Sequence, residues 1–346
     1  MVEREEKSID NKDKQEAEEA FKMGKNLKMC IDVGGTKIAY GILNGDNEIL
    51  FRHQTKTPID ITPDEFTQKM YKEIDEALAL AGMKEEDLVG IALGMPSYVD
   101  FERGYVISSG SIEKIKNYPV REELQKKYSV PILVDNDTNV AALAEHKYGA
   151  GRGFKHIIYM ALSTGTGTGF IINGDLFRGT YGGAGESGHM IVTPGQGIID
   201  GCGNPGCIMS YSSGCQVTRH AKIMIEAGYK TMLADMVDDL DDLTAKDIAE
   251  AYQKGDEVAT KIFDMMCKYA AIHIYNLFIS ININCFVCGG GLTNMGDFYL
   301  DRIREEVDKL NHQDNQEIII KKAELDGDFG LIGSGILIDQ LLGGEN

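Results

Sequence analysis

The chain has 346 residues, of which 43% are hydrophobic and 40 are glycine, and this length favours two domains or one large two-lobed unit. The formal net charge of −19 disfavours nucleic acid as a partner, because nucleic-acid binding needs clustered Lys and Arg. No apolar run of about 18 residues or more occurs, so no membrane-spanning helix and no membrane partner are predicted.

Residues 1–28 are predicted to form a polar N-terminal extension, disordered or loosely helical. They carry eight acidic and seven basic residues, with too few apolar residues to bury one face. They also lack the apolar core of a signal peptide. The chain has seven cysteines, an odd number, and several lie in apolar segments (Cys30, Cys285, Cys288), which favours a reducing cytoplasm. We therefore expect a cytoplasmic protein.

The segment after the extension is predicted to open on an antiparallel meander. Apolar strands around 28–33 and 38–43 flank a Gly-Gly-Thr turn, and a third strand lies around 48–52. Further elements follow in this order: a helix over 65–82, a strand over 88–93, a loop over 94–100, a helix over 119–128, a strand over 131–134 and a helix over 138–148. Strands that alternate with helices in this way predict an α/β fold with mixed sheets.

A second meander is predicted to begin with a strand over 157–162, with Gly165-Thr166-Gly167 as its turn. The plan of the first half therefore repeats. The remaining elements are helices over 216–228, 244–254 and 256–278, a strand over 283–288, a helix over 298–310, a strand over 318–322 and a final helix over 328–342.

The stretch from Leu162 to His189 combines glycines at alternating positions with a close of Gly-Glu-Ser-Gly-His. Backbone amides next to glycine reach phosphate oxygens without obstruction by a Cβ. A Gly-rich hairpin without a ligand is the alternative for the glycines alone. Asp32 with Gly34-Gly35-Thr36 makes a comparable turn, in which a carboxylate at a strand end can hold a Mg²⁺-bound water. The alternative there is a hairpin whose Asp caps a strand.

The same stretch resembles the signature of the ROK family, the sugar kinases and related repressors of the actin-like ATPase fold. The matching residues are Leu162, Gly165, Thr166, Gly167, Gly169, Phe170, Gly179, Gly185, Gly188 and His189. The resemblance extends from about Met29 to the C-terminus. It implies a two-lobed actin-like ATPase (ribonuclease H-like) fold with the active site in the cleft between the lobes. The first lobe would span 29–149, completed by the C-terminal helix 328–346, and the second 150–327.

The resemblance also implies ATP and Mg²⁺ as cofactors, since phosphoryl transfer depends on positioning and on charge stabilisation. The first phosphate motif would comprise Asp32, Gly34, Gly35, Thr36 and Lys37. The second would comprise Thr164, Gly165, Thr166 and Gly167. The adenosine-side loop would run from Gly289 through Gly290 and Gly291 to Asn294, and a plain strand-to-helix turn is the alternative.

Asp137 is the candidate general base, because the family's catalytic Asp occupies this position after an Asn that holds the sugar. A hydroxyl nucleophile needs a carboxylate in hydrogen-bond reach of its proton. The alternative is that Asp137 only caps a helix. The candidate sugar-binding residues are Asn136, Glu186, His189, Gly94 and Pro96. A buried ion pair is the alternative for Glu186 and His189.

A structural Zn²⁺ is implied at His189, Asp200, Cys202 and Cys207. Many family members carry three thiolates and this His, and here Asp200 replaces the first thiolate. Zn²⁺ also accepts carboxylate oxygen. The alternative is a loop that has lost its metal. Met209 departs from the family too, because a Glu that contacts the sugar near C1 and C2 usually stands there.

These features together predict an ATP-dependent hexose kinase, glucokinase-like, that phosphorylates a sugar hydroxyl, most simply O6. A sugar-responsive ROK regulator is the alternative, although the 1–28 extension is too short and polar for a helix-turn-helix domain. A non-catalytic family member is a further alternative. The resemblance implies a homodimer. Because Met209 is apolar, we expect a preferred sugar that differs from glucose at C1, C2 or C3.

Overall fold

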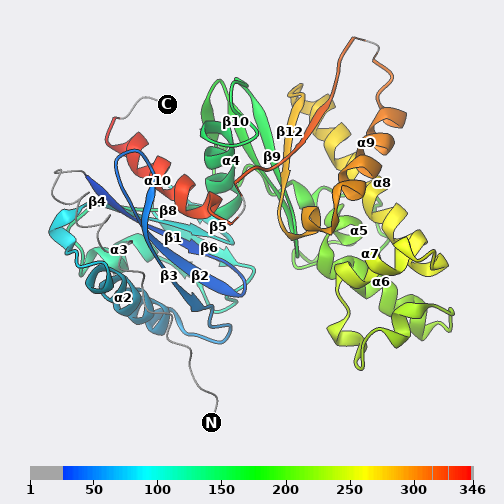
Figure 1. Cartoon of the computed structure of the whole chain (residues 1–346), viewed down its shortest axis with the longest axis horizontal. Helices are drawn as coiled ribbons and strands as arrows, with labels where there is room; N and C mark the ends of the chain where they lie inside the picture. Colours follow the sequence, from blue (N-terminus) through cyan, green and yellow to red (C-terminus); the bar gives the residue numbers. More distant parts are fainter. Residues whose placement is uncertain (1–25, 314, 326, 344–346) are drawn as a thin grey trace. The chain divides into compact units, whose positions relative to one another are not determined.

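The computed structural model describes residues 26–313, 315–325 and 327–343, and it divides into two compact units (Figure 1). The first unit contains the chain up to Ala144, a short segment Tyr181–Gly183, and the part after Leu325. The second unit contains Glu145–Thr180 and Ala184–Leu325. The expected polar extension lies outside the described residues, except that Leu27 and Lys28 are part of the first strand.

The first unit is built on a five-stranded mixed sheet of order β3-β2-β1-β4-β8. Its strands are β1 Leu27–Val33, β2 Lys37–Leu43, β3 Ile49–Lys56, β4 Leu88–Met95 and β8 Ile132–Asn136. Strands β1, β2 and β3 form the antiparallel meander, whereas β1, β4 and β8 run parallel. The sequence predictions of an antiparallel meander and of a mixed sheet are confirmed for this unit.

Two helices cover opposite faces of this sheet (Figure 1). Helix α2 (Pro63–Leu80) begins with a capping box between Thr62 and Glu65 and buries Phe66, Met70 and Ile74 in the core that β1 also faces. Alternate β1 residues point to the other face, where helix α10 (Phe329–Leu341) packs on β1 and β4. There Lys28 is buried and pairs with Asp339 of α10.

The expected loop over 94–100 is wrong, because only Pro96 of this segment lies outside a strand. Gly94 and Met95 end β4, and Ser97–Asp100 forms strand β5, which pairs with β6 (Tyr105–Ser109) in a small sheet that also holds β7 (Lys116–Tyr118). Val99 and Val106 are buried in the core of the unit, which explains why so short a hairpin is ordered. Helix α3 (Val120–Gln125) follows, and η1 (Glu85–Asp87) precedes β4.

The second unit repeats the plan with a sheet of order β11-β10-β9-β12-β13. Its strands are β9 Ile157–Leu162, β10 Thr166–Ile172, β11 Asp175–Phe177, β12 Cys285–Gly289 and β13 Ile319–Lys322. Neighbours run antiparallel from β9 to β11 and parallel from β9 to β13, as in the first sheet. The expected turn is shifted, because Thr166 and Gly167 belong to β10 and the turn is residues 163–165.

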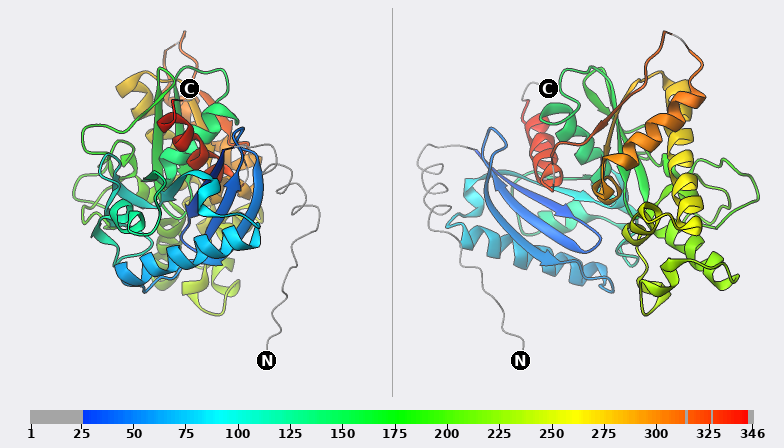
Figure 2. Two further views of the ribbon diagram at one scale, coloured as in Figure 1. Left: turned by 90° about the vertical axis from the view of Figure 1, so that its left-hand side faces the viewer. Right: turned by 45° about the vertical axis from the view of Figure 1, so that its right-hand side comes forward.

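Helices pack on the second sheet around the long helix α8 (Glu257–Ile281), whose first turn is capped by Asp256 (Figure 2). The helices that contact α8 are α5 Met209–Ser212, α6 Gly214–Glu226, α7 Ala245–Gln253 and α9 Asp297–Leu310. Helix α4 (Asp137–Lys147) follows β8, and its residues up to Ala144 belong to the first unit. Short 3-10 turns are η2 Ser187–His189, η3 Met232–Asp235, η4 Leu240–Asp242 and η5 Gly291–Met295.

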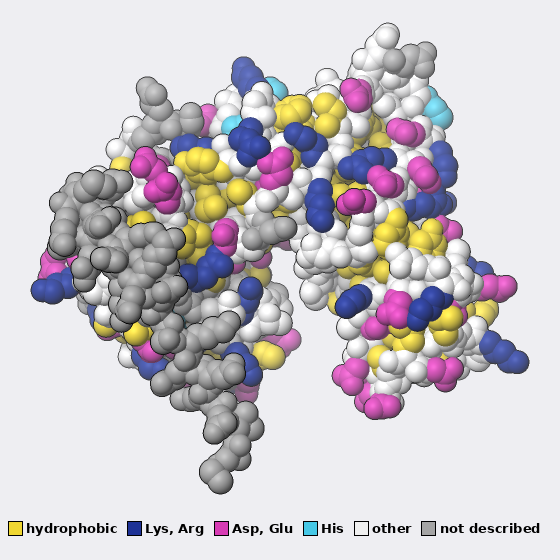
Figure 3. Space-filling view, viewed as in Figure 1, with side chains coloured by type: hydrophobic (Ala, Val, Ile, Leu, Met, Phe, Trp, Pro, Cys, Tyr) yellow, Lys and Arg dark blue, Asp and Glu magenta, His cyan; other side chains and the backbone are white. Residues whose placement is uncertain are grey.

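On the face drawn in Figure 3, acidic and basic side chains are interspersed. In the described part of the chain, no helix combines the length and the apolar character that crossing a membrane requires.

Candidate active site

In the first unit, the carboxyl ends of three parallel strands bring the candidate residues together. Asp32 of β1 lies opposite Gly94 of β4, and Gly94 lies opposite Asp135 of β8. Asn136 ends β8, and Asp137 begins α4 directly after it. Ligands of open α/β sheets bind at this edge, so the fold gathers the acidic candidates where a ligand is expected.

The turn between β1 and β2 is held by hydrogen bonds at its base. Gly34 N donates to Lys37 O at 2.9 Å, and Thr57 Oγ1 donates to Gly34 O at 2.6 Å. A Cβ on Gly34 would lie 2.9 Å from Lys37 O, so the turn needs glycine there. Gly35, Thr36 and Lys37 are exposed at the tip. The turn is therefore fixed in shape and open to a ligand.

The Asp32 carboxylate sits beside this turn, against helix α10. A Cβ on Gly330 would lie 2.3 Å from Asp32 Cγ, so glycine allows the helix to approach the carboxylate. Burial raises the pKa of Asp32 to about 6, an effect that the positive charges of Lys37 and Arg52 partly offset. A carboxylate whose pKa is raised by burial is typical of functional sites, where such a group binds a cation or exchanges a proton.

Asn136, and not Asp137, caps helix α4. Asn136 Oδ1 accepts from the backbone N–H groups of Thr138 (2.8 Å) and Asn139 (3.2 Å). Asn136 Nδ2 donates one hydrogen bond to Ser97 O at 3.0 Å. The interpretation of Asp137 as only an N-cap is therefore wrong. Asp137 is half-buried in the first turn of the helix, where the helix dipole favours the ionised carboxylate.

Asp137 and Pro96 have defined neighbours within the first unit. Asp137 Oδ1 accepts from the Thr138 N–H at 2.8 Å and lies 3.3 Å from Thr138 Oγ1. Pro96 links β4 to β5, and its carbonyl accepts from Gly110 N at 3.2 Å. Both candidates thus stand at the same edge of the sheet as Asn136.

In the second unit, the predicted phosphate turn adjoins the predicted adenosine loop. Gly214 N donates to Ser163 O at 2.8 Å, and Cys215 N donates to Thr164 O at 3.2 Å, so the start of α6 holds the turn. Gly290 has φ +92°, and a Cβ there would lie 2.6 Å from Leu162 O. The sequence places Thr164–Gly167 and Gly289–Gly291 far apart, and the structure brings them side by side.

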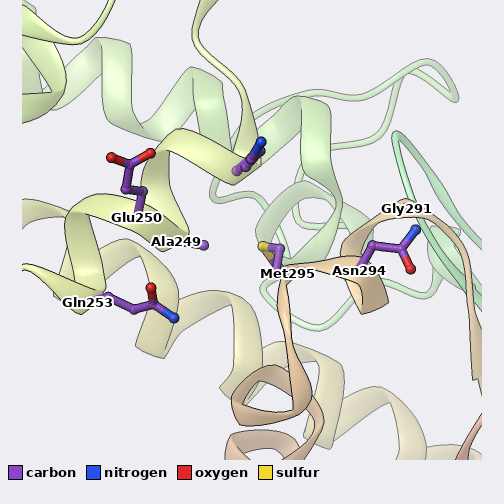
Figure 4. A pocket seen from close by; sticks show the side chains of 7 residues that line it. Ala249, Glu250, Gln253, Gly291, Asn294 and Met295 are labelled. Carbon is purple, nitrogen blue, oxygen red and sulfur yellow. The ribbon is translucent and has the colours of Figure 1, made fainter.

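A pocket of about 280 Å³ opens beside this pair of loops (Figure 4). It is lined by Lys246, Ala249, Glu250 and Gln253 of α7 and by Gly291, Asn294 and Met295 of η5. Gly291 and Asn294 belong to the adenosine-side loop expected from the sequence. The residues of α7 were missed because a helix that buries one face shows no separate signal for the residues that line a pocket.

The Gly-Glu-Ser-Gly-His segment packs tightly on β10. A Cβ on Gly185, which has φ +104°, would lie 1.9 Å from Thr168 O, and one on Gly188 would lie 2.1 Å from Thr166 O. Glu186 Oε2 lies 4.0 Å from His189 Nε2, and the two side chains are 44% and 34% exposed. The interpretation as a buried ion pair is therefore wrong, and both groups can reach a ligand. Desolvation raises the pKa of Glu186, and His189 offsets part of this.

The four candidate zinc ligands lie together in the second unit. One ligand atom from each of His189, Asp200, Cys202 and Cys207 lies within 4.8 Å of all the others. His189 Nδ1 is 3.2 Å from Asp200 Oδ2, and the two sulfur atoms are 3.4 Å apart. Zn²⁺ binds such atoms at about 2.0–2.3 Å in a tetrahedron, which separates them by about 3.3–3.8 Å. The donor set therefore fits a zinc ion.

Met209 begins α5 and lies between the phosphate turn and the Gly-Glu-Ser-Gly-His segment. Its Cε is 3.8 Å from the position of a Cβ on Gly165, and its Cβ is 3.4 Å from that of one on Gly188. The side chain is half-buried. A thioether therefore stands where the family resemblance implies a carboxylate.

Comparison with known proteins agrees with this geometry. The model of the ROK family matches residues 28–341. A glucokinase from Halalkalibacterium halodurans is 32% identical, over 90% of this chain and 94% of its own length. A xylose repressor from Caldicellulosiruptor bescii is 26% identical, over 81% of this chain and 69% of its own length. A solved ROK family glucokinase from Streptomyces griseus, in complex with glucose and AMPPNP, superposes with a TM-score of 0.76 at 31% identity, over 91% of this chain and 100% of its own.

Proposed function

The chain belongs to the ROK family of the two-lobed actin-like ATPase fold, and we propose that it is an ATP-dependent hexose kinase with Asp137 as general base. The observation that carries the proposal is the edge of the first sheet. There Asn136 caps α4, and Asp137 follows in the first turn of the helix, at the same edge as Asp32 and Gly94. The similarity to glucokinases and to an N-acetyl-D-glucosamine kinase from Mannheimia succiniciproducens supports a sugar substrate.

In the proposed reaction, Asp137 accepts the proton of a sugar hydroxyl, most simply that on O6. The freed oxygen attacks the γ-phosphorus of ATP. A new O–P bond forms while the bond from the γ-phosphorus to the bridging oxygen breaks, and ADP leaves with that electron pair. The helix dipole at the start of α4 keeps Asp137 ionised and ready to accept the proton.

The phosphates of ATP are proposed to bind at the backbone turns Gly34–Lys37 and Thr164–Gly167. Asp32 would hold Mg²⁺ through a water ligand, and Mg²⁺ would supply neutralisation of the phosphate charge. The start of α6 adds the positive end of a helix dipole to the second turn. The adenosine is proposed to lie against Gly289–Gly291, with the adjoining pocket of α7 and η5 for its base.

The sugar is proposed to contact Glu186, His189, Asn136, Gly94 and Pro96. Vicinal hydroxyls offer both donors and acceptors, which suits a carboxylate, an imidazole and an amide. His189 would serve twice, with Nδ1 toward the metal loop and Nε2 toward the sugar. The structural Zn²⁺ would then fix the imidazole by binding His189, Asp200, Cys202 and Cys207.

The test of the general base is Asp137→Asn, which removes the proton acceptor and keeps the shape of the side chain. We expect turnover to fall by about 10²–10⁴-fold while sugar affinity stays within about tenfold. Steady-state kinetics and calorimetric titration with sugar measure the two quantities. A variant that keeps more than a few per cent of wild-type turnover shows that the base is elsewhere.

A sugar-binding regulator is the second candidate function. It is favoured by the similarity to the xylose repressor from Caldicellulosiruptor bescii. A regulator would bind sugar without releasing ADP, so an ATP-consumption assay distinguishes it from a kinase.

A further inference from the structure

Beneath the Glu186–His189 segment, three polar side chains form a buried chain of hydrogen bonds. His273 of α8 is fully buried, and its Nε2 lies 2.8 Å from Ser187 Oγ. Ser187 Oγ lies 2.8 Å from Thr168 Oγ1, and Thr168 Oγ1 donates to Gly185 O at 3.2 Å. The chain thus runs from the helix core to the backbone on both sides of Glu186.

The direction of these hydrogen bonds follows from the groups at the two ends. The Gly185 carbonyl can only accept, so the Thr168 hydroxyl donates to it and accepts from the Ser187 hydroxyl. Ser187 must then accept from an N–H on His273 Nε2. Burial lowers the pKa of His273 to about 4, so the ring is neutral and its one proton lies on Nε2. His273 Nδ1 has no hydrogen-bond partner among the described residues, which agrees with this tautomer.

The buried chain of hydrogen bonds fixes the backbone that carries Glu186. Gly185 is held a second time, because Thr168 N donates to its carbonyl at 2.9 Å. The Glu186 side chain itself is 44% exposed, with His189 Nε2 at 4.0 Å. Its orientation therefore depends on Gly185 and Ser187, the neighbours that the buried chain holds.

We propose that His273 is a positioning residue for the sugar-binding carboxylate, and that it acts through Ser187 and Thr168 to orient Glu186. The inference rests on the proposed function, since it takes Glu186 as a sugar contact. If His273 were only a core residue, an apolar side chain of similar size would serve as well. Its Nε2–H would then have no effect on sugar binding.

Three variants test the chain of hydrogen bonds. His273→Phe and Ser187→Ala should each raise the KM for the sugar about three- to tenfold, the fold-change that corresponds to one hydrogen bond. The KM for ATP should stay unchanged, and kcat should stay within about twofold. His273→Gln should restore most of the sugar KM, because its amide N–H lies near the position of Nε2.

Ile274→Ala is the matched control for lost packing. Ile274 is the next residue on α8 and is fully buried, but its side chain makes no hydrogen bond. Ile274→Ala should lower Tm and leave the sugar KM unchanged. An equal rise of the sugar KM in Ile274→Ala would overturn the proposal, because the effect would then be one of packing alone.

Glu186→Gln separates this inference from the proposed function. A rise of the sugar KM in Glu186→Gln and in His273→Phe is the expected result. A rise in Glu186→Gln with none in His273→Phe and Ser187→Ala overturns the positioning role and keeps the sugar contact. No change in Glu186→Gln overturns the sugar contact itself, and with it the proposal for His273.

Discussion

The two sheets of the molecule have the same strand order, but their equivalent edges carry different chemistry. In the first unit, Asp32 of β1 lies opposite Gly94, whereas in the second Ala161 of β9 lies opposite Gly289. The first edge therefore presents a carboxylate where the second presents a methyl group. Duplication of the fold supplies two backbone turns, but the charged groups at the strand ends are found in the first.

This difference suggests that the two edges have different roles in binding and catalysis. A carboxylate edge can hold a magnesium-bound water and accept a proton, as we propose for Asp32 and Asp137. An uncharged edge of glycines and hydroxyls leaves backbone amides for phosphate and does not repel it. Met209, beside Gly165, extends the uncharged character of the turn Thr164–Gly167 to the place where a carboxylate was expected.

Met209→Glu adds a charge beside the uncharged turn Thr164–Gly167. Its effect should be larger than the effects of Asp32→Asn and Cys207→Ser, which are described below. A hydrogen bond to a charged group is worth about 1.5–3 kcal/mol, which corresponds to about one to two powers of ten in affinity. Activity on glucose relative to the preferred sugar should rise by this factor. The preferred sugar itself should differ from glucose at C1, C2 or C3.

Steady-state kinetics on glucose, mannose, allose, fructose and an N-acylhexosamine provide the measurement, with Met209→Gln as the uncharged control. A wild-type protein whose highest specificity constant is for glucose would show that Met209 has been compensated elsewhere.

The Asp32 carboxylate should make the kcat/KM for MgATP depend on pH. The pKa of Asp32 is raised to about 6, so the ionised form that holds Mg²⁺ is lost as pH falls through this value. The kcat/KM for MgATP should fall about tenfold per pH unit below pH 6, unlike that of Asp32→Asn, whose activity is low but flat in this range.

Stability gives an independent check on Asp32. A raised pKa means that the folded state favours the protonated form, so the stability contributed by Asp32 is lost as pH rises through about 6. Asp32→Asn should therefore raise Tm at pH 8 and change it little at pH 4. A Tm difference that does not depend on pH would contradict the buried, ionised carboxylate.

Loss of zinc from the site of His189, Asp200, Cys202 and Cys207 should have the smallest effect of the three changes. The effect should be seen in thermal stability. Cys207→Ser should remove zinc, expected at one ion per chain, and lower Tm by several degrees, because a structural metal site contributes directly to folding. Elemental analysis of protein purified without a His tag and thermal unfolding measure both. Cys215→Ser, a thiol outside the cluster, is the control. Metal-free wild-type protein with full activity would refute the zinc site.

Much of the fold follows from periodicity along the sequence. The apolar run of β1, which is buried along almost its whole length, and the capped, amphipathic pattern of α2 are local properties, so they are visible without a structure. The repeated strand order was also predictable, because each half opens on a meander with a glycine turn. The strand β5 was missed because its partner β6 supplies the pairing, and the sequence of β5 alone reads as a loop.

In the candidate site, too, some residues could be predicted from local sequence and others could not. Motif residues such as Asp32 and Gly165 can be identified from their spacing relative to glycines. His273 does not, because a single histidine in an apolar helix looks like a core residue, and Ser187 lies 86 positions away. Contacts of this kind arise from tertiary packing and are absent from any local pattern. The pocket residues of α7 were missed for the same reason.

Sugar-dependent formation of ADP is the direct measurement of the proposed phosphoryl transfer from ATP to a sugar hydroxyl. The full chain is incubated with MgATP and each sugar of the panel, and ADP and sugar phosphate are both quantified. We expect one ADP per sugar phosphate with at least one hexose or hexose derivative, and neither product with Asp137→Asn. Tight binding of a sugar without ADP or sugar phosphate from any member of the panel would contradict it.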